Sequence, residues 1–185
     1  MENNNDDIWI GPAIPGDGKG IAAVHKTTWL ATYPNVRAGI TENDILSMAK
    51  FFDNAEHVKE WEEKILSNGK NGYFICVAKN NGHVVAFCGG QEFENHNQLM
   101  ALYIAPGFQK RGIGKRLWCR VFEWMGSGKR IVVTPVVYNL PAIGFYEKVG
   151  FKKVSGKFSA KEMPTGKVLR MVEMEILPRS SSKNF

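Results

Sequence analysis

The chain has 185 residues, of which 44% are hydrophobic and 23% are charged, and its formal net charge is +6. This length suits one domain with a full hydrophobic core, and the composition is that of an ordinary globular protein. No apolar run approaches the ~20 residues that a membrane-spanning helix needs, and the acidic start MENNNDD has no secretory-signal pattern. We therefore expect a cytoplasmic protein with no membrane partner.

Three regions are expected along the chain. Residues 1–7 are polar and predicted to be disordered, residues 8–177 form a single domain, and residues 178–185 form a flexible tail without core-forming side chains. Cys76, Cys88 and Cys119 are isolated within apolar segments, with no C-x-x-C pair. They predict buried free thiols rather than a disulfide or a metal site.

The first third of the domain is predicted to be mainly helical. The expected segments are a strand at Ile8–Ile10, a Gly/Pro loop at Gly11–Gly18, a helix from about Ile21 to Tyr33, a helix opened by Thr41 and a helix at Ala55–Leu66. Asp17 is the predicted cap of the first helix. Pro34 ends that helix, because proline disfavours helical geometry at the preceding residue.

Strands dominate the remainder of the chain. Asn80-Asn81-Gly82 is a tight-hairpin signal between two of them. The predicted strands are Tyr73–Lys79, His83–Phe93, Leu99–Ile104, Arg130–Thr134, Lys152–Phe158 and Val168–Ile176, and the predicted helices begin at Gly112 and Leu140. This order predicts an α/β domain with a mixed sheet of about seven strands.

The stretch from Leu99 to Glu123 is the most informative part of the chain. An apolar strand is broken by Pro106-Gly107, and a turn rich in glycine and positive charge leads into an amphipathic helix. A helix N-terminus preceded by glycines is suited to binding an anion. The Walker phosphate loop is excluded because Ile113 stands where its lysine is required. The Rossmann dinucleotide-binding pattern is excluded because no G-x-G-x-x-G occurs. A solvated basic face beside a flexible turn is the structural alternative.

Two blocks of the sequence resemble the GNAT superfamily of acetyl-CoA-dependent N-acyltransferases. Gln109-Lys-Arg-Gly112-Ile-Gly114 matches the Q/R-x-x-G-x-G/A signature, and the segment from Asn139 to Phe151 matches N-x-x-A-x-x-F-Y-x-K-x-G-F. The resemblance implies a twisted central sheet flanked by helices, whose fourth and fifth strands splay apart around acetyl-CoA (coenzyme A). The residues that it implies for the coenzyme are Leu102, Tyr103, Ile104, Gln109, Lys110, Arg111, Gly112, Ile113, Gly114, Lys115, Asn139, Ala142, Phe145 and Lys148.

The same resemblance nominates Tyr146 as the general acid for the departing thiolate. The alternative is a packing aromatic with a satisfied hydroxyl. Asn139 is implied in holding the pantetheine arm, and it is also a candidate helix N-cap. A backbone N–H near Tyr103–Ile104 would polarise the acetyl carbonyl if the strand carried a bulge there.

The general base is the weak point of the match. Two positions that often carry a glutamate in relatives are Gln98 and Thr134 here, and neither side chain is a base at neutral pH. Glu92, Glu94 and His96 are close in sequence and would act through water, or else they are exposed polar residues at a strand end.

The acceptor is predicted to be a small-molecule amine. Trp29 and Tyr33 resemble a W-x-x-x-Y stretch of a subgroup that acts on polyamines and other small amines, and Glu92 is a further candidate for binding the substrate. A substrate cation over Trp29 would be held by its ring, whereas core packing is the alternative use. Glu162 in the last loop is an exposed carboxylate that would attract a cation.

Three other interpretations remain open: acetylation of a protein N-terminus or lysine, a non-catalytic acyl-CoA-binding module, and nucleic-acid binding through the basic helix. The missing carboxylates favour the module, whereas Tyr146 favours catalysis. A small polyanionic ligand accounts for the clustered positive charge, and no nucleic-acid motif accompanies it, so we expect no dedicated nucleic-acid site. A homodimer is possible, and no metal is expected.

Overall fold

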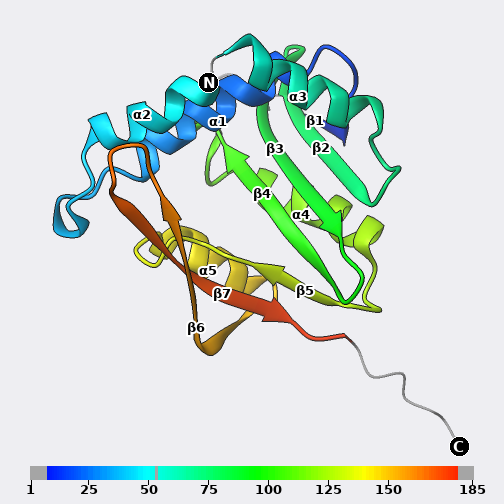
Figure 1. The fold of residues 1–185 in the computed structure, drawn as a ribbon. Helices are drawn as coiled ribbons and strands as arrows, with labels where there is room; N and C mark the ends of the chain where they lie inside the picture. The colour runs from blue at the N-terminus through cyan, green and yellow to red at the C-terminus, as the bar shows by residue number, and fades with distance from the viewer. Residues whose placement is uncertain (1–7, 53, 179–185) are drawn as a thin grey trace, which may run out of the picture.

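The computed structural model describes residues 8–52 and 54–178, so the predicted disordered start and nearly all of the predicted tail lie outside the described residues. The chain forms a seven-stranded mixed sheet in the order β1-β2-β3-β4-β5-β7-β6 (Figure 1). The strands are β1 (Trp9–Pro12), β2 (Tyr73–Asn80), β3 (His83–Glu92), β4 (His96–Ile104), β5 (Arg130–Val133), β6 (Lys152–Glu162) and β7 (Val168–Ile176). The helices are α1 (Gly18–Thr32), α2 (Glu42–Phe52), α3 (Ala55–Leu66), α4 (Ile113–Met125) and α5 (Leu140–Lys148), with short 3₁₀ turns at Val36–Ala38 and Pro106–Phe108.

The bounds predicted from the sequence lie within a few residues of the observed bounds for most helices and strands. The β2–β3 hairpin turns through Asn81 and Gly82, both with positive φ, as two-residue hairpin turns require. The strand expected at Leu99 begins at His96, and the strand expected to end at Phe158 continues to Glu162. In each case the extra residues pair with a neighbouring strand, which periodicity within one segment does not reveal.

The predicted helix cap at Asp17 is wrong in its contacts. Asp17 occupies the N-cap position of α1, but its side chain makes no capping hydrogen bond and its backbone is helical rather than extended. Its carboxylate instead accepts from the Ile14 N–H at 3.0 Å and pairs with Lys79 Nζ at 2.7 Å. Asp17 therefore connects the N-terminus of α1 to β2 through this ion pair.

Alternate residues of the central strands face two separate cores. Cys76 and Cys88 pack with α4 on one face, whereas Val77 and Phe87 pack with α1 and α3 on the other. This alternation follows from the two-residue period of a strand. The sheet is thus covered on both faces, and α5 joins the α4 side through Ile143 and Tyr146 (Figure 1).

The thiol prediction is correct for two of the three cysteines. Cys76 and Cys88 are buried free thiols, but Cys119 is exposed on α4, because the amphipathic helix turns that position away from the sheet. Among residues 8–52 and 54–178, no helix has the length and apolarity to cross a membrane.

β4 and β5 are parallel neighbours that separate partway along their length. They pair only at His96–Arg130, Asn97–Ile131 and Gln98–Val132, while β4 continues to Ile104. Figure 1 shows the resulting wedge between β4 and the β5–β7 part of the sheet. Among the described residues, no strand pairs with the backbone edge of β4 beyond Gln98 on this side.

Candidate active site

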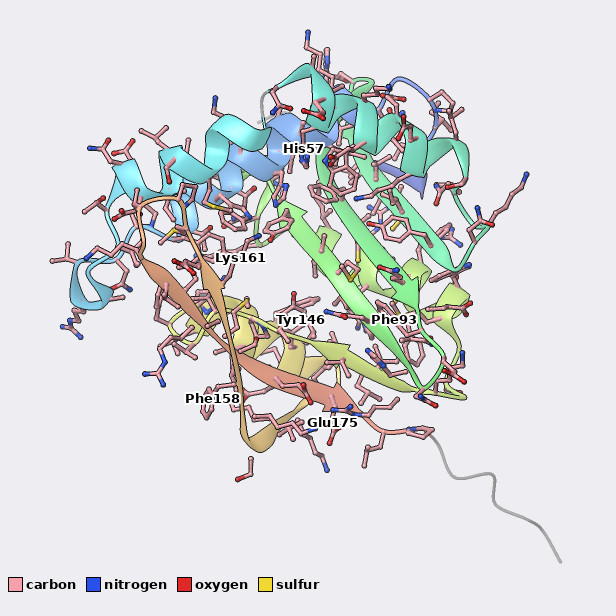
Figure 2. The ribbon with its side chains drawn as sticks, in the orientation of Figure 1. His57, Phe93, Tyr146, Phe158, Lys161 and Glu175 are labelled. Carbon is pink, nitrogen blue, oxygen red and sulfur yellow. The ribbon has the colours of Figure 1, made fainter. Side chains whose placement is uncertain are left out.

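A cavity of about 840 Å³ lies where β4 and β5 diverge. Its walls are the strand segment 99–104, the end of α1 with Tyr33, the turn before α4, and α5 with the loop that precedes it. Figure 2 shows Tyr146 in the middle of this opening, between β4 and β5. Splitting two strands exposes backbone groups within the sheet, so the site has polar atoms where a closed sheet would have none.

The strand bulge lies earlier than the Tyr103–Ile104 position considered from the sequence. The β3–β4 register shifts between Gly89 and Gly90, which pair with Ala101 and Leu99, so Met100 is the extra residue. A bulge leaves one residue unpaired and bends its strand. All residues from Leu99 to Ile104 line the cavity.

The turn before α4 forms a site for an anion. Lys110 and Gly112 have φ values of 62° and 76°, and Gly112 caps α4 with no side-chain hydrogen bond. The first-turn N–H groups of α4 therefore have no capping side chain, and the helix dipole favours negative charge beside them. A Cβ at Gly114 would stand 3.2 Å from Ile104 Cδ1, so this glycine lets α4 lie close to β4. These residues fit the diphosphate of a coenzyme.

Two side chains brace this turn from within. Gln109 Nε2 donates to the Ile104 carbonyl at 3.1 Å, and Arg111 Nη2 donates to the Gly107 carbonyl at 2.9 Å. The Arg111 guanidinium also lies over the Phe108 ring at 5.2 Å. Lys110 lines the cavity and remains available to a phosphate.

Asn139 is the N-cap of α5. Its Oδ1 accepts from the Ala142 N–H at 3.2 Å, and the residue also lines the cavity. The cap consumes an acceptor lone pair and leaves the amide NH₂ for other contacts. The two roles considered from the sequence are therefore compatible.

Tyr146 is buried, and its hydroxyl has no hydrogen-bond partner among the described residues. Its ring lies edge-on to Phe145 and Phe151, with centroids 5.5 and 5.6 Å away. Burial raises the pKa of Tyr146 above its ordinary value, and Cys88 and Tyr103 raise it further. The phenol is thus held protonated, as a proton donor must be.

Four of the five tyrosines of the chain line this one cavity: Tyr33, Tyr103, Tyr138 and Tyr146. Burial raises the pKa of Tyr33, and the neighbouring Tyr103 adds to the effect. Burial also raises the pKa of Tyr103, against opposing contributions from Trp29 and Tyr33. Tyr138 donates from its hydroxyl to the Tyr33 carbonyl at 2.8 Å. The wall therefore offers neutral hydroxyls and aromatic surface.

None of the described residues that line the cavity is an aspartate or a glutamate. Thr134 is in the wall, whereas Gln98 pairs with Val132 and is not. The side chains considered as alternative bases lie at the opposite end of β4: Glu92 pairs with Asn97, and the His96 ring stacks on Phe93. The structure thus separates Glu92, Glu94 and His96 from the cavity, because the strand runs away from it at that end.

Most of the residues nominated from the sequence surround the cavity. Those in its wall are Tyr33, Leu102, Tyr103, Ile104, Gln109, Lys110, Gly114, Asn139, Ala142, Phe145, Tyr146 and Lys148. Arg111, Gly112, Ile113 and Lys115 adjoin it at the start of α4, where the buried Ile113 offers only its backbone. Tyr138 and Met100 also line the cavity but were not nominated from the sequence, although Tyr138 directly precedes the Asn139 motif.

Trp29 and Glu92 are not in the wall. Trp29 is buried edge-on against Tyr33, with ring centroids 4.9 Å apart. Lys161 Nζ on β6 lies 5.0 Å over the Trp29 ring. The predicted substrate cation over Trp29 therefore meets a ring face that already has an ammonium above it.

A family model described as "Acetyltransferase (GNAT) family" matches residues 41–151. The chain belongs to this family. The donor of GNAT acetyltransferases is acetyl-CoA, and the turn before α4, with no capping side chain on its first-turn N–H groups, fits the diphosphate of that donor. Its sheet, with a parallel β4–β5 pair that diverges, is the predicted fold.

A curated relative of this GNAT protein is the spore coat polysaccharide biosynthesis protein SpsD of Bacillus subtilis (strain 168). The two are 28% identical over 145 residues, which is 77% of this chain and 46% of SpsD. The chain thus spans less than half the length of that relative.

Solved acetyltransferases share the fold at low identity. The PaiA N-acetyltransferase of Thermoplasma acidophilum, solved with coenzyme A, has a TM-score of 0.72 at 21% identity and covers 92% of this chain and 99% of its own. The yncA protein of Salmonella typhimurium, solved with acetyl-CoA, has a TM-score of 0.66 at 18% identity, with 95% and 96% covered.

Proposed function

We propose that this protein transfers the acetyl group of acetyl-CoA directly to the primary amine of a small molecule, with both substrates bound together. When bound, acetyl-CoA supplies a thioester whose acetyl group passes to the amine. The observation that carries the proposal is the hydroxyl of Tyr146, a mostly buried residue of the cavity wall that makes no hydrogen bond to another described residue.

The coenzyme end of the cavity is the side formed by α4 and α5. The first-turn N–H groups of α4 and the Lys110 ammonium bind the diphosphate, since both present positive charge to the same space. The unpaired edge of β4 and the Asn139 amide bind the pantetheine arm. This arrangement directs the thioester toward Tyr146.

Deprotonating the amine is the larger energetic problem. A free alkylamine has a pKa of ~10.4, so its neutral form costs about 4.6 kcal/mol at pH 7. The described part of the cavity wall has no carboxylate to act as base, but its aromatic and apolar surface desolvates a bound ammonium and so lowers its pKa. Lys148 acts in the same direction, because a nearby cation disfavours a second one.

Tyr146 completes the proton transfers. The neutral amine nitrogen bonds to the carbonyl carbon as the carbon–sulfur bond breaks, and Tyr146 protonates the departing sulfur. The new amide nitrogen releases a proton to water, and the Tyr146 phenolate takes a proton back from water. In water a phenol of pKa ~10 would give its proton to a thiolate of pKa ~8.5 at a cost of about 2 kcal/mol. Burial raises the pKa of Tyr146, and it would disfavour a buried thiolate for the same reason, because both are anions.

A small acceptor is supported by the shape and chemistry of the site. The space left beyond the coenzyme is bordered by the aromatic side chains of Tyr33, Tyr103 and Tyr138. SpsD, the relative named for polysaccharide biosynthesis, is in keeping with a small or sugar-like acceptor. A polyamine is less well supported than an amino-acid-like amine, because no carboxylate is present in the described wall to pair with a second ammonium.

The test is acetyl-CoA consumption with a panel of amines, comparing wild type with Tyr146→Phe and Tyr138→Phe. Removing the Tyr146 hydroxyl breaks no hydrogen bond that the structure records, so Tm should be unchanged while kcat falls about 10²–10⁴-fold with unaltered coenzyme affinity. Tyr138→Phe is the matched control. It leaves the Tyr33 carbonyl without its hydrogen-bond donor and should lower the free energy of unfolding by about 1 kcal/mol, with a far smaller loss of kcat. Equal turnover of wild type and Tyr146→Phe would refute the catalytic role.

The absence of a carboxylate from the described cavity wall favours one other candidate, a non-catalytic acyl-CoA-binding module. It predicts coenzyme A binding in calorimetry with no thiol release from acetyl-CoA for any amine. Failure to bind coenzyme A at all would refute both candidates.

A further inference from the structure

Lys161 is a cation outside the cavity wall that the proposed chemistry does not use, and it is connected to the acceptor end through aromatic contacts. It lies on β6, and Figure 2 shows it between the β6–β7 hairpin and α1. Its Nζ is 5.0 Å above the Trp29 ring, and its charge also acts on His25. Trp29 is in edge contact with Tyr33, and the His25 ring is 4.7 Å from that of Tyr103. The ammonium is therefore one ring away from two tyrosines of the cavity wall.

This ammonium has no ion-pair partner in the described part of the chain. Two other lysines of β6 show the contrast, since Lys153 pairs with Glu147 at 3.4 Å and Lys157 with Glu173 at 3.6 Å. Desolvation by the neighbouring protein lowers the pKa of Lys161, and no carboxylate acts against that effect. The residue is nevertheless exposed to solvent, so an anionic ligand can reach its ammonium and gain a charge-assisted contact there.

The hairpin that carries Lys161 is held firmly against the helices. Met163, two residues along, is buried in a cluster with Trp29, Tyr33 and Ile45. Asp44 on α2 interacts with Thr165 in the same loop. The backbone of Lys161 is thus fixed, while its four-carbon stem lets the ammonium move between the Trp29 face and a ligand.

We propose that the acceptor amine is carried by a small molecule that also bears an anionic group, a carboxylate or a phosphate, and that Lys161 binds this group. The proposal rests on the proposed acetyltransferase function. The acceptor's anion supplies the counterion that Lys161 lacks, and the neutral tyrosine wall accommodates its amine in uncharged form. A polycation, in contrast, would meet the Lys161 ammonium with no carboxylate in the described wall to offset the repulsion.

Matched acceptors of one chain length test this inference directly. The probes are 4-aminobutyrate, butylamine and 1,4-diaminobutane, together with an aminoalkyl phosphate to distinguish a phosphate from a carboxylate ligand. Wild type should show kcat/KM in the order anionic, neutral, cationic, with about a tenfold gap between the first two, the size expected for one charge-assisted contact. Coenzyme A binding is measured on the same samples by calorimetry.

Two variants locate the preference. Lys161→Gln should remove the gap through KM while leaving kcat for butylamine and the affinity for coenzyme A unchanged, and Lys161→Glu should reverse the order. Lys152→Gln, an exposed lysine at the start of the same strand, is the control and should keep the order of wild type. The inference is overturned if the wild-type enzyme prefers the diamine or shows no preference among the probes. It is also overturned if the preference survives in Lys161→Gln, or if protein that binds acetyl-CoA transfers the acetyl group to none of the probes. Loss of coenzyme binding in wild type would instead refute the proposed function.

Discussion

Gly112 and Gly107 offer a matched pair of substitutions that tests the turn on which coenzyme binding depends. Gly112 has φ of 76°, in the left-handed region, whereas Gly107 does not have a positive φ. An added Cβ at either position meets no heavy atom within 4 Å. Replacing each by alanine therefore differs in backbone strain and in little else.

The magnitude follows from two opposing contributions. An L-residue held in the left-handed region costs about 1–2 kcal/mol, and Gly→Ala at either site lowers the entropy of the unfolded chain, which stabilises by about 0.4–1 kcal/mol. The entropic contribution cancels between the two variants. Gly112→Ala should therefore be about 1–2 kcal/mol less stable than Gly107→Ala, a difference of roughly 2–8 °C in Tm for a domain of this size.

The assay is thermal unfolding of both variants with and without coenzyme A. The Gly112→Ala side chain projects into the space beside the first turn of α4, so the increase in Tm on adding coenzyme A should shrink in this variant and persist in Gly107→Ala. Equal Tm values would show that residue 112 is not held in the left-handed conformation. An undiminished coenzyme effect in Gly112→Ala would show that the phosphates bind elsewhere.

Two further predictions concern pH and thiol reactivity. Hydrogen bonds from Thr41, and then Thr165, lower the pKa of Asp44 from 3.8 to about 2. The stability that the Asp44 carboxylate contributes is therefore complete above about pH 4 and is lost as the pH falls toward 2. Tm measured from pH 5 to 2 should fall less steeply in Asp44→Asn than in wild type, and parallel curves would contradict the assignment. Cys119 is exposed whereas Cys76 and Cys88 are buried, so a thiol reagent should label one cysteine in the native protein and all three after denaturation, and Cys119→Ser should abolish the fast phase.

Short-range signals account for the parts of the fold that the sequence predicted well. Asn81-Gly82 specifies a hairpin because few residue types tolerate positive φ at both turn positions. Ala55–Leu66 was delimited correctly because Asn54 caps the helix, accepting from the His57 N–H at 2.6 Å. Motif spacing likewise predicted the order of the elements around the cavity, since each motif lies within one turn-and-helix unit.

Contacts between distant segments decided the rest. Asp17 has the residue type of a cap, yet Lys79 on β2, far along the chain, determines where its carboxylate points. The absence of a carboxylate from the described cavity wall depends on where β4 and β5 separate. The three residue pairs between these strands determine the point of separation.

By itself, the sequence determined the family, the donor and the glycine turn, because these are written in contiguous residues whose backbone preferences act locally. Only the tertiary structure placed Lys161 over Trp29 and gathered four tyrosines from α1, β4, α5 and their loops into one wall. Such a neighbourhood is set by packing across the whole sheet, and no pattern within a single segment records it.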